Sequence, residues 1–205
     1  MAEHGEVFTP PWMVEAMLDL LGHESERIDS RVLEPACGSG NFLVPVLKRK
    51  LATVHGRYGR SSFERSHHAL FALMSVYGIE LLEDNVRECR QNLLAVFSDY
   101  LKVEAATEWH RAAAAVVELN IVHGDALSMT TRSATPEPFT FAEWAYLGKG
   151  VYRRRDFQYD KLTQMSSFGD ELPIGDPGKH EIFMPTRDHG SLSVSDIARA
   201  GGFGE

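Results

Sequence analysis

The chain has 205 residues, a length that suits one domain or one domain with an appendage, and its 43% hydrophobic content is ordinary for a globular protein. Its formal net charge of −8 argues against broad nonspecific binding to nucleic acid, because that binding depends on Lys and Arg neutralising phosphates. No apolar run is long enough to span a membrane.

The N-terminus and the cysteines indicate the compartment. Residues 1–6 contain neither the basic nor the apolar region of a signal peptide. The two cysteines, Cys37 and Cys89, are too few for a disulfide framework and form no metal-binding motif. We therefore expect a cytoplasmic protein in a reducing environment, with no resident metal and no membrane contact.

The first predicted element is a helix. Thr9 can cap a first turn that contains two prolines, and apolar residues then recur at helical spacing as far as Leu21. Gly22 is a typical C-terminal stop for this helix. A polar connection over residues 23–30 leads to a short strand over residues 31–34.

A glycine-rich loop follows that strand. Residues 32–43 read Val-Leu-Glu-Pro-Ala-Cys-Gly-Ser-Gly-Asn-Phe-Leu, a pattern that predicts a strand, a loop and the start of a helix. Gly38 and Gly40 allow the backbone to approach a ligand, and the helix start offers free N–H groups to it. The bland alternative is that the turn only connects two elements. Leu43 stands where the dinucleotide fingerprint needs a third Gly, so NAD and FAD are disfavoured against another adenosyl cofactor.

Helices and strands alternate over the next part of the chain, which favours a parallel sheet covered by helices. The connection between the first two of these helices, residues 55–62, is expected to be a loop rich in Gly, Ser and Arg. We predict helices over residues 41–54, 63–74, 83–97 and 104–117, and strands over residues 75–81 and 120–127.

The character of the sequence changes after Leu127. Residues 128–138 form a Ser/Thr/Pro-rich loop, and residues 139–160 are dense in aromatics with poor helical or strand periodicity. The arginines at 153–155 are the clearest local basic patch, and with the aromatics they suit stacking on bases and contact with phosphates. The alternative is an aromatic cluster that docks the tail onto the sheet or onto a partner. We therefore divide the chain into a core, residues 1–127, and an irregular extension, residues 128–205.

Three predicted strands end in an acidic residue: Glu34, Glu80 and Asp125. The carboxyl ends of parallel strands lie side by side, so one cofactor could span all three acids. The second acid is placed to accept hydrogen bonds from ribose hydroxyls, and the third from the exocyclic amine of adenine. Each acid alone has a simpler interpretation as a helix cap or a loop charge.

Four segments together resemble class I S-adenosylmethionine-dependent methyltransferases, of the N6-adenine DNA methyltransferase kind found in restriction–modification systems. LEPACGSGNFL resembles the first motif of that family, and GEVFTPPWMVEAML the preceding segment that closes over the methionine end of the cofactor. YGIELLEDNV resembles the ribose-binding motif, and NIVHGDAL the third motif. Their order is the non-permuted one, and together they cover about residues 5–127.

The resemblance implies a fold, a cofactor and a set of contacts. The expected fold is an α/β, Rossmann-like class I methyltransferase sheet, parallel and incomplete, with the irregular C-terminal extension. The expected cofactor is S-adenosyl-L-methionine, and DNA is the expected partner, directly or through a complex. The cofactor-binding residues implied are Phe8, Thr9, Pro10, Glu34, Pro35, Ala36, Cys37, Gly38, Gly40, Asn41, Phe42, Glu80, Leu81, Asp125, Ala126 and Leu127.

One motif of the family is missing. A polar residue followed by Pro-Pro-aromatic should end the fourth strand, where it holds the target amine and stacks on the flipped base. No such motif follows Asp125, and Thr9-Pro10-Pro11-Trp12 lacks the apolar strand that should precede it. The catalytic residues are therefore unassigned. Two functions stay open: a truncated or split methyltransferase component that a second chain or a continuation beyond residue 205 completes, and a non-catalytic cofactor-binding sensor or assembly subunit.

Overall fold

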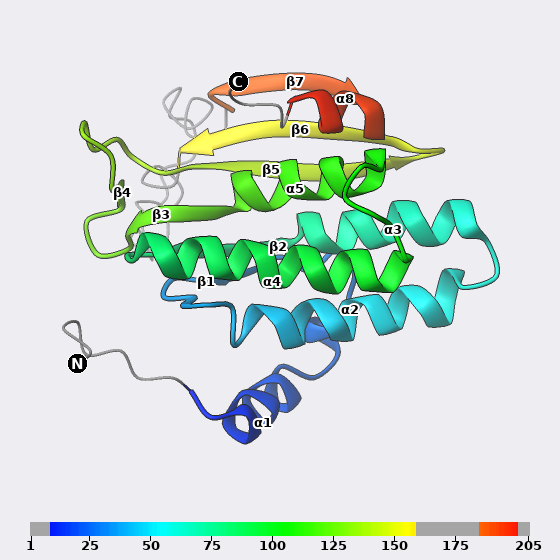
Figure 1. Cartoon of the computed structure of the whole chain (residues 1–205), viewed down its shortest axis with the longest axis horizontal. Helices are drawn as coiled ribbons and strands as arrows, with labels where there is room; N and C mark the ends of the chain where they lie inside the picture. Colours follow the sequence, from blue (N-terminus) through cyan, green and yellow to red (C-terminus); the bar gives the residue numbers. More distant parts are fainter. Residues whose placement is uncertain (1–8, 159–184, 201–205) are drawn as a thin grey trace, which may run out of the picture.

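The computed structural model describes residues 9–158 and 185–200, which form an α/β fold with two sheets (Figure 1). Helices and strands alternate through the first sheet, and an antiparallel sheet follows it. The elements in chain order are α1 (Pro11–Leu21), η1 (Gly22–Ser25), β1 (Val32–Glu34), α2 (Leu43–Tyr58), α3 (Ser62–Met74), β2 (Val76–Glu80), α4 (Glu83–Leu101), α5 (Glu108–Asn120), β3 (Ile121–Asp125), β4 (Thr130–Thr131), β5 (Thr140–Gly148), β6 (Val151–Gln158), β7 (Arg187–Leu192) and α8 (Val194–Ala200).

The first sheet has the strand order β1-β2-β3-β4. Strands β1, β2 and β3 are parallel, with Glu34 beside Gly78 and Glu80 beside His123, whereas β4 pairs antiparallel with β3. The prediction that parallel strands bring their acidic ends to one edge is confirmed for these three strands. The sheet as a whole is mixed, not purely parallel.

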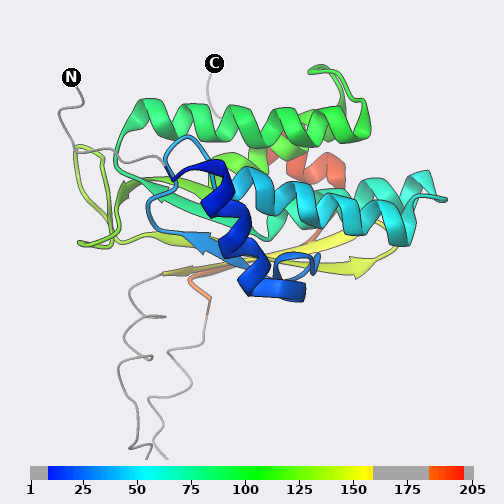
Figure 2. The ribbon, with the colours of Figure 1, turned by 90° about the horizontal axis from the view of Figure 1, so that it is seen from below.

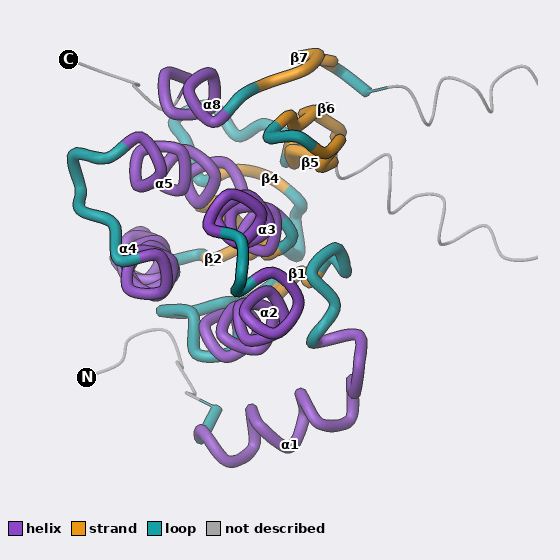
Figure 3. Tube along the Cα trace, turned by 90° about the vertical axis from the view of Figure 1, so that its right-hand side faces the viewer, coloured by secondary structure: helices purple, strands orange, loops and turns teal. Residues whose placement is uncertain are grey.

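The second sheet corrects the prediction of an irregular extension. Strands β5 and β6 form an antiparallel hairpin, and β7 pairs antiparallel with β6. Gly148, Lys149 and Gly150 all have positive φ and make the turn, which is a hairpin signal within the aromatic stretch. The aromatic side chains at 139, 141, 144 and 152 are buried, so they belong to the hydrophobic core and do not form an exposed stacking surface. In Figure 3, α5 and α8 lie on one side of this sheet.

The two sheets share one hydrophobic core. Tyr77 on β2 donates a hydrogen bond to the carbonyl of Ala142 on β5, at 2.8 Å. Asn120, 1% exposed, donates to the carbonyls of Met74 and Val76 and accepts from Trp144 Nε1, each at 3.1 Å. Every polar group of this buried amide is therefore satisfied, as burial requires.

Local signals explain most helix boundaries, with two exceptions. Ser61 caps α3 by accepting from the Glu64 amide at 3.3 Å, and the glycine at 22 ends α1 as predicted. The N-cap of α1 is Pro10, and no side chain caps it, so the prediction of a Thr9 cap is wrong. The loop predicted over residues 55–62 is also wrong, because α2 continues to Tyr58; a single glycine costs a helix only about 1 kcal/mol, which packing overrides.

Helix α1 lies outside α2, apart from the other helices (Figures 1 and 2). Val14 and Leu18 are its buried side chains. Arg49 on α2 bonds to Glu15 and Asp19 on α1, each at 2.6 Å, which fixes α1 against α2.

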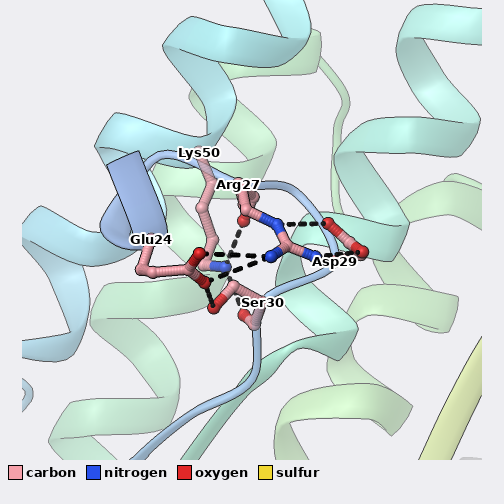
Figure 4. Close-up of polar contacts among 5 residues, drawn as sticks. All are labelled: Glu24, Arg27, Asp29, Ser30 and Lys50. Atoms are coloured by element: carbon pink, nitrogen blue, oxygen red, sulfur yellow. Dashed lines mark hydrogen bonds and ion pairs between the residues drawn. The ribbon is translucent and has the colours of Figure 1, made fainter. Parts of the chain in front are cut away.

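A buried lysine holds the chain just before β1 (Figure 4). Lys50 on α2 is 0% exposed, and its ammonium donates to the carbonyls of Arg27 at 2.6 Å and Ser30 at 2.5 Å. Burial lowers the pKa of Lys50 to about 8, and the nearby Asp29 opposes that shift. This contact positions β1 and, with it, the loop that follows β1.

Candidate cofactor site

The glycine loop leaves β1 at the carboxyl edge of the sheet. Gly38 has φ +52° and Gly40 has φ +94°, conformations that L side chains rarely adopt, so both positions favour glycine. A Cβ added at Gly38 would meet nothing within 4 Å. The Gly40 amide donates to the Cys37 carbonyl at 2.9 Å, and the Val44 amide donates to the Gly40 carbonyl at 2.9 Å, which leads the loop into α2. The loop is therefore a tight turn with open space over Gly38.

Glu80 at the end of β2 holds this loop. Its Oε2 accepts from the Gly38 amide at 2.8 Å, and its Oε1 accepts from the Leu82 amide at 3.0 Å. The residue is 8% exposed. Because a carboxylate oxygen accepts more than one hydrogen bond, each oxygen retains capacity for a ligand hydroxyl.

Cys37 is a packing residue of the loop. Its amide donates to the Ile79 carbonyl at 3.0 Å, which ties the loop to β2. A hydrogen bond with Cys89, followed by burial, raises the pKa of the Cys37 thiol far above its ordinary value. The thiol therefore stays neutral at physiological pH and does not act as a nucleophile.

A cleft of about 570 Å³ lies beside the loop, between α1, α2 and α4. It brings together four of the predicted cofactor residues, Thr9, Pro10, Gly40 and Asn41. The N-terminal segment and the glycine loop, whose residues in this cleft are about 30 apart in sequence, therefore share one cleft. Lys48, Glu15 and Asp99 place charges of both signs in its lining.

The other predicted residues lie outside that cleft. Glu34 and Phe42 line a separate cavity of about 650 Å³ beside α1 and β1, where burial raises the pKa of Glu34. Asp125 lines a third cavity, of about 260 Å³, and its Oδ1 accepts from the Leu127 amide at 2.8 Å. Residues Pro35, Ala36, Leu81 and Leu127 are exposed, and Ala126 is half-buried. Phe8 lies outside the described residues.

The arginines of β6 are paired, so they do not form the free basic patch considered from the sequence. Arg153 pairs with Asp188 on β7, and Arg155 pairs with Glu143 on β5. Arg154 donates Nε to Asp156 at 2.8 Å and lies over the Trp144 ring, 5.7 Å from its centroid. Each positive charge thus faces a carboxylate within the second sheet.

Two residues important for the loop were missed from the sequence, Asn92 and Lys50. Asn92 Nδ2, on α4, donates to the Ser39 carbonyl at 2.9 Å. A signal for Asn92 existed: it follows Cys89 by three residues, so both lie on one face of the predicted helix. A lone lysine in a helix gives no comparable sign of burial.

Over residues 9–158 and 185–200 no three His, Cys, Asp or Glu residues gather where they could hold a metal ion. Within those ranges no helix has the length and apolar content needed to cross a membrane.

The geometry defines an α/β protein with a glycine-rich loop at the carboxyl edge of parallel strands. The model of the N-6 DNA methylase family matches residues 1–109, more than half of the chain, so the protein belongs to this family. Comparisons with curated proteins and with solved structures found no match. The resemblance to N6-adenine DNA methyltransferases is confirmed by the family match.

Proposed function

We propose that the chain binds S-adenosyl-L-methionine at the glycine loop and forms part of a site that methylates the N6 amine of adenine in DNA. Membership of the N-6 DNA methylase family supports the reaction and the cofactor. The proposal rests on one observation: Glu80 holds the Gly38 amide at 2.8 Å, while the space that a Cβ of Gly38 would enter is open. A loop with this shape suits an adenosyl cofactor, and its place at the carboxyl ends of parallel strands is consistent with the Rossmann-like class I fold that the resemblance implies.

The proposal gives five of the predicted residues a part in holding the cofactor. Glu80 would accept hydrogen bonds from the ribose hydroxyls, and Asp125 from the exocyclic amine of adenine. Thr9 and Pro10, with Phe8, would close over the methionine end. The bound cofactor supplies the electrophilic methyl group, and these residues orient it toward the target amine.

A second polypeptide is part of the proposal. The sequence has no Pro-Pro-aromatic motif between Asp125 and Glu205, so the acceptors for the target amine would come from another chain or from sequence beyond residue 205. Among the described residues β1 is the outermost strand of its sheet, and Leu33 on it is 37% exposed. An outer edge with unpaired backbone groups accepts a further strand. The resemblance extends the proposal to a restriction–modification or related defence system in the cytoplasm.

A second candidate function is a non-catalytic cofactor-binding sensor or assembly subunit. The pairing of Arg153, Arg154 and Arg155 with carboxylates favours it, since those arginines have neutralised charges in place of a free surface for phosphates. Under this alternative the chain would bind the cofactor but act through protein partners. Addition of a second chain that carries the Pro-Pro-aromatic motif would then give no methyl transfer.

The cofactor proposal is tested by calorimetric titration with S-adenosylmethionine and S-adenosylhomocysteine. Replacing Glu80 with Ala should weaken binding by roughly 1–3 kcal/mol, as expected for the loss of a buried hydrogen-bond partner. Glu83→Ala is the matched control, because Glu83 is exposed at the start of α4. No heat with either ligand would reject the cofactor site, and equal affinity of Glu80→Ala and the wild type would reject the role of Glu80.

The need for a second chain is tested with a radiolabelled methyl donor and adenine-containing DNA. We expect no label on DNA with the purified chain alone. Transfer by the chain alone would reject the proposal that another polypeptide supplies the catalytic acceptors.

A further inference from the structure

Helix α4 lies directly against the glycine loop. A Cβ built at Gly40 would be 3.1 Å from Cys89 Sγ and 3.7 Å from Cys89 Cα. These distances place the loop backbone on the surface of the helix, with space for a hydrogen at that point and little more.

Asn92 follows Cys89 by three residues, so both side chains lie on the same face of α4. Asn92 Nδ2 donates to the Ser39 carbonyl at 2.9 Å, in a half-buried position. On the other side of the loop, Glu80 accepts from the Gly38 amide at 2.8 Å. Two neighbouring residues of the loop are therefore fixed through opposite backbone groups, one by an acceptor on β2 and one by a donor on α4.

These two contacts fix the Cys37–Gly38 and Ser39–Gly40 peptide units, which flank the peptide unit between Gly38 and Ser39. That unit lies at the point where the backbone is open to a ligand, because a Cβ at Gly38 would meet nothing within 4 Å. If the Ser39 carbonyl lost its donor, the Ser39–Gly40 peptide would be held only by the hydrogen bond from the Gly40 amide to the Cys37 carbonyl, and a ligand would then have to bear more of the cost of ordering the loop. Holding a binding loop in advance improves affinity in this way.

We propose that Asn92, which also lines the cleft beside the loop, is a positioning residue for the cofactor loop and acts through the Ser39 carbonyl. The inference rests on the proposed function, since it concerns affinity for S-adenosylmethionine at that loop. Asn92 therefore couples α4 to cofactor binding, although α4 carries none of the residues predicted to contact the cofactor.

The test is the variant Asn92→Asp, which keeps the size of the side chain but replaces the amide donor with a carboxylate. At pH 8 the carboxylate faces the Ser39 carbonyl with no proton to donate, and calorimetry should find an affinity for S-adenosylmethionine about tenfold below that of the wild type. Partial burial and the facing carbonyl raise the pKa of the introduced carboxyl, so at pH 5 a larger fraction is protonated and can donate, and the deficit should be smaller than at pH 8. A purely structural loss would not recover with pH.

Gln91→Glu is the matched control, because it makes the same change from amide to acid on the next, exposed residue of α4. Its affinity should equal that of the wild type at both pH values. If Asn92→Asp does not fold at pH 8, Asn92→Ala removes the donor without adding charge, and about a fivefold loss is expected at both pH values.

The outcomes separate the inference from the proposed function. A wild-type chain that does not bind S-adenosylmethionine rejects the cofactor site itself. A wild-type chain that binds, with Asn92→Asp or Asn92→Ala binding equally well at pH 8, overturns the role of Asn92 alone. A deficit of Asn92→Asp that stays the same at pH 5 overturns it as well.

Discussion

The buried Lys50 predicts an unusual dependence of stability on pH. The folded protein releases the Lys50 proton near pH 8, whereas the unfolded chain retains it to about pH 10.5. Between these values the unfolded state binds more protons, so the free energy of unfolding rises with pH. The contribution is complete above pH 10.5 and is lost as the pH falls through 8. At 1.36 kcal/mol per pKa unit, the rise between pH 7.5 and 9.5 is about 2 kcal/mol.

The measurement is urea unfolding at pH 7.5 and pH 9.5, followed by circular dichroism. With a slope near 2 kcal/mol per molar urea, the midpoint should move upward by about 1 M. The measurement stops at pH 9.5 because two buried tyrosines act in the opposite direction at higher pH. Burial raises the pKa values of Tyr77 and Tyr152 in the folded protein. Above about pH 10 the unfolded chain therefore loses these protons first, which lowers the free energy of unfolding.

The comparison is between Lys50→Met and Lys48→Met, since Lys48 is an exposed lysine on the same helix. Lys50→Met should abolish the rise, and Lys48→Met should keep it. Lys50→Met also leaves the carbonyls of Arg27 and Ser30 without their donor, so at pH 7.5 its stability reflects that loss as well as the removal of a buried charge. A rise of equal size in Lys50→Met, or no rise in the wild type, would refute the assignment.

Three further predictions concern the loop and the second sheet. Gly78→Ala places a Cβ 2.8 Å from Cys37 Sγ and should cost about 1–3 kcal/mol in urea unfolding, whereas Gly56→Ala, with open space on α2, should be neutral or stabilise by up to about 1 kcal/mol; equal effects of the two would contradict the packing. Trp144→Phe should destabilise the fold by about 1–3 kcal/mol by the same assay, because Asn120 Oδ1 loses its buried donor, and an unchanged midpoint would exclude that hydrogen bond. Arg153→Ala should change affinity for a DNA duplex by less than about twofold in fluorescence anisotropy, because Arg153 is paired with Asp188; a larger loss would mean that this arginine contacts phosphate.

The sequence predicted the first sheet well because its signals are local. Each strand of β1, β2 and β3 is a short apolar run, and each is followed by a polar residue or a turn that marks its end. The helices α3, α4 and α5 were all predicted, with boundaries that agree with the structure to within four residues. The parallel order followed from the alternation of helices and strands.

The second sheet was not predicted because its residues do not alternate simply. Strand β5 buries Phe141, Ala142 and Trp144, and the adjacent Phe141 and Ala142 point to opposite faces, so no clean period of two appears. The arginines of β6 look like a free basic patch in the sequence, because their carboxylate partners on β5 and β7 are distant along the chain. Only the turn at residues 148–150 carried a local signal of the hairpin.

The sequence predicted candidate residues for the site, but it predicted only in part which of them lie together in the structure. Glu80 and the glycine loop meet as expected, because β1 and β2 are neighbours in register. Glu34 points into a different cavity from Gly40, a difference of face that sequence spacing alone does not determine for a residue at a strand end. The contact of Asn92 with the loop depends on how α4 packs, which is tertiary information.

The junction of the two sheets has a consequence for how this family varies. A Cβ at Gly124 would lie 2.2 Å from Phe139 Cε1 and 2.6 Å from the Thr130 carbonyl oxygen, so the aromatic ring occupies the volume of the missing side chain. A larger residue at 124 is therefore compatible only with a smaller one at 139 and a shifted strand β4. Among relatives that keep both sheets, positions 124 and 139 should change together, and an alignment of such relatives would reveal this compensation as a correlated pair.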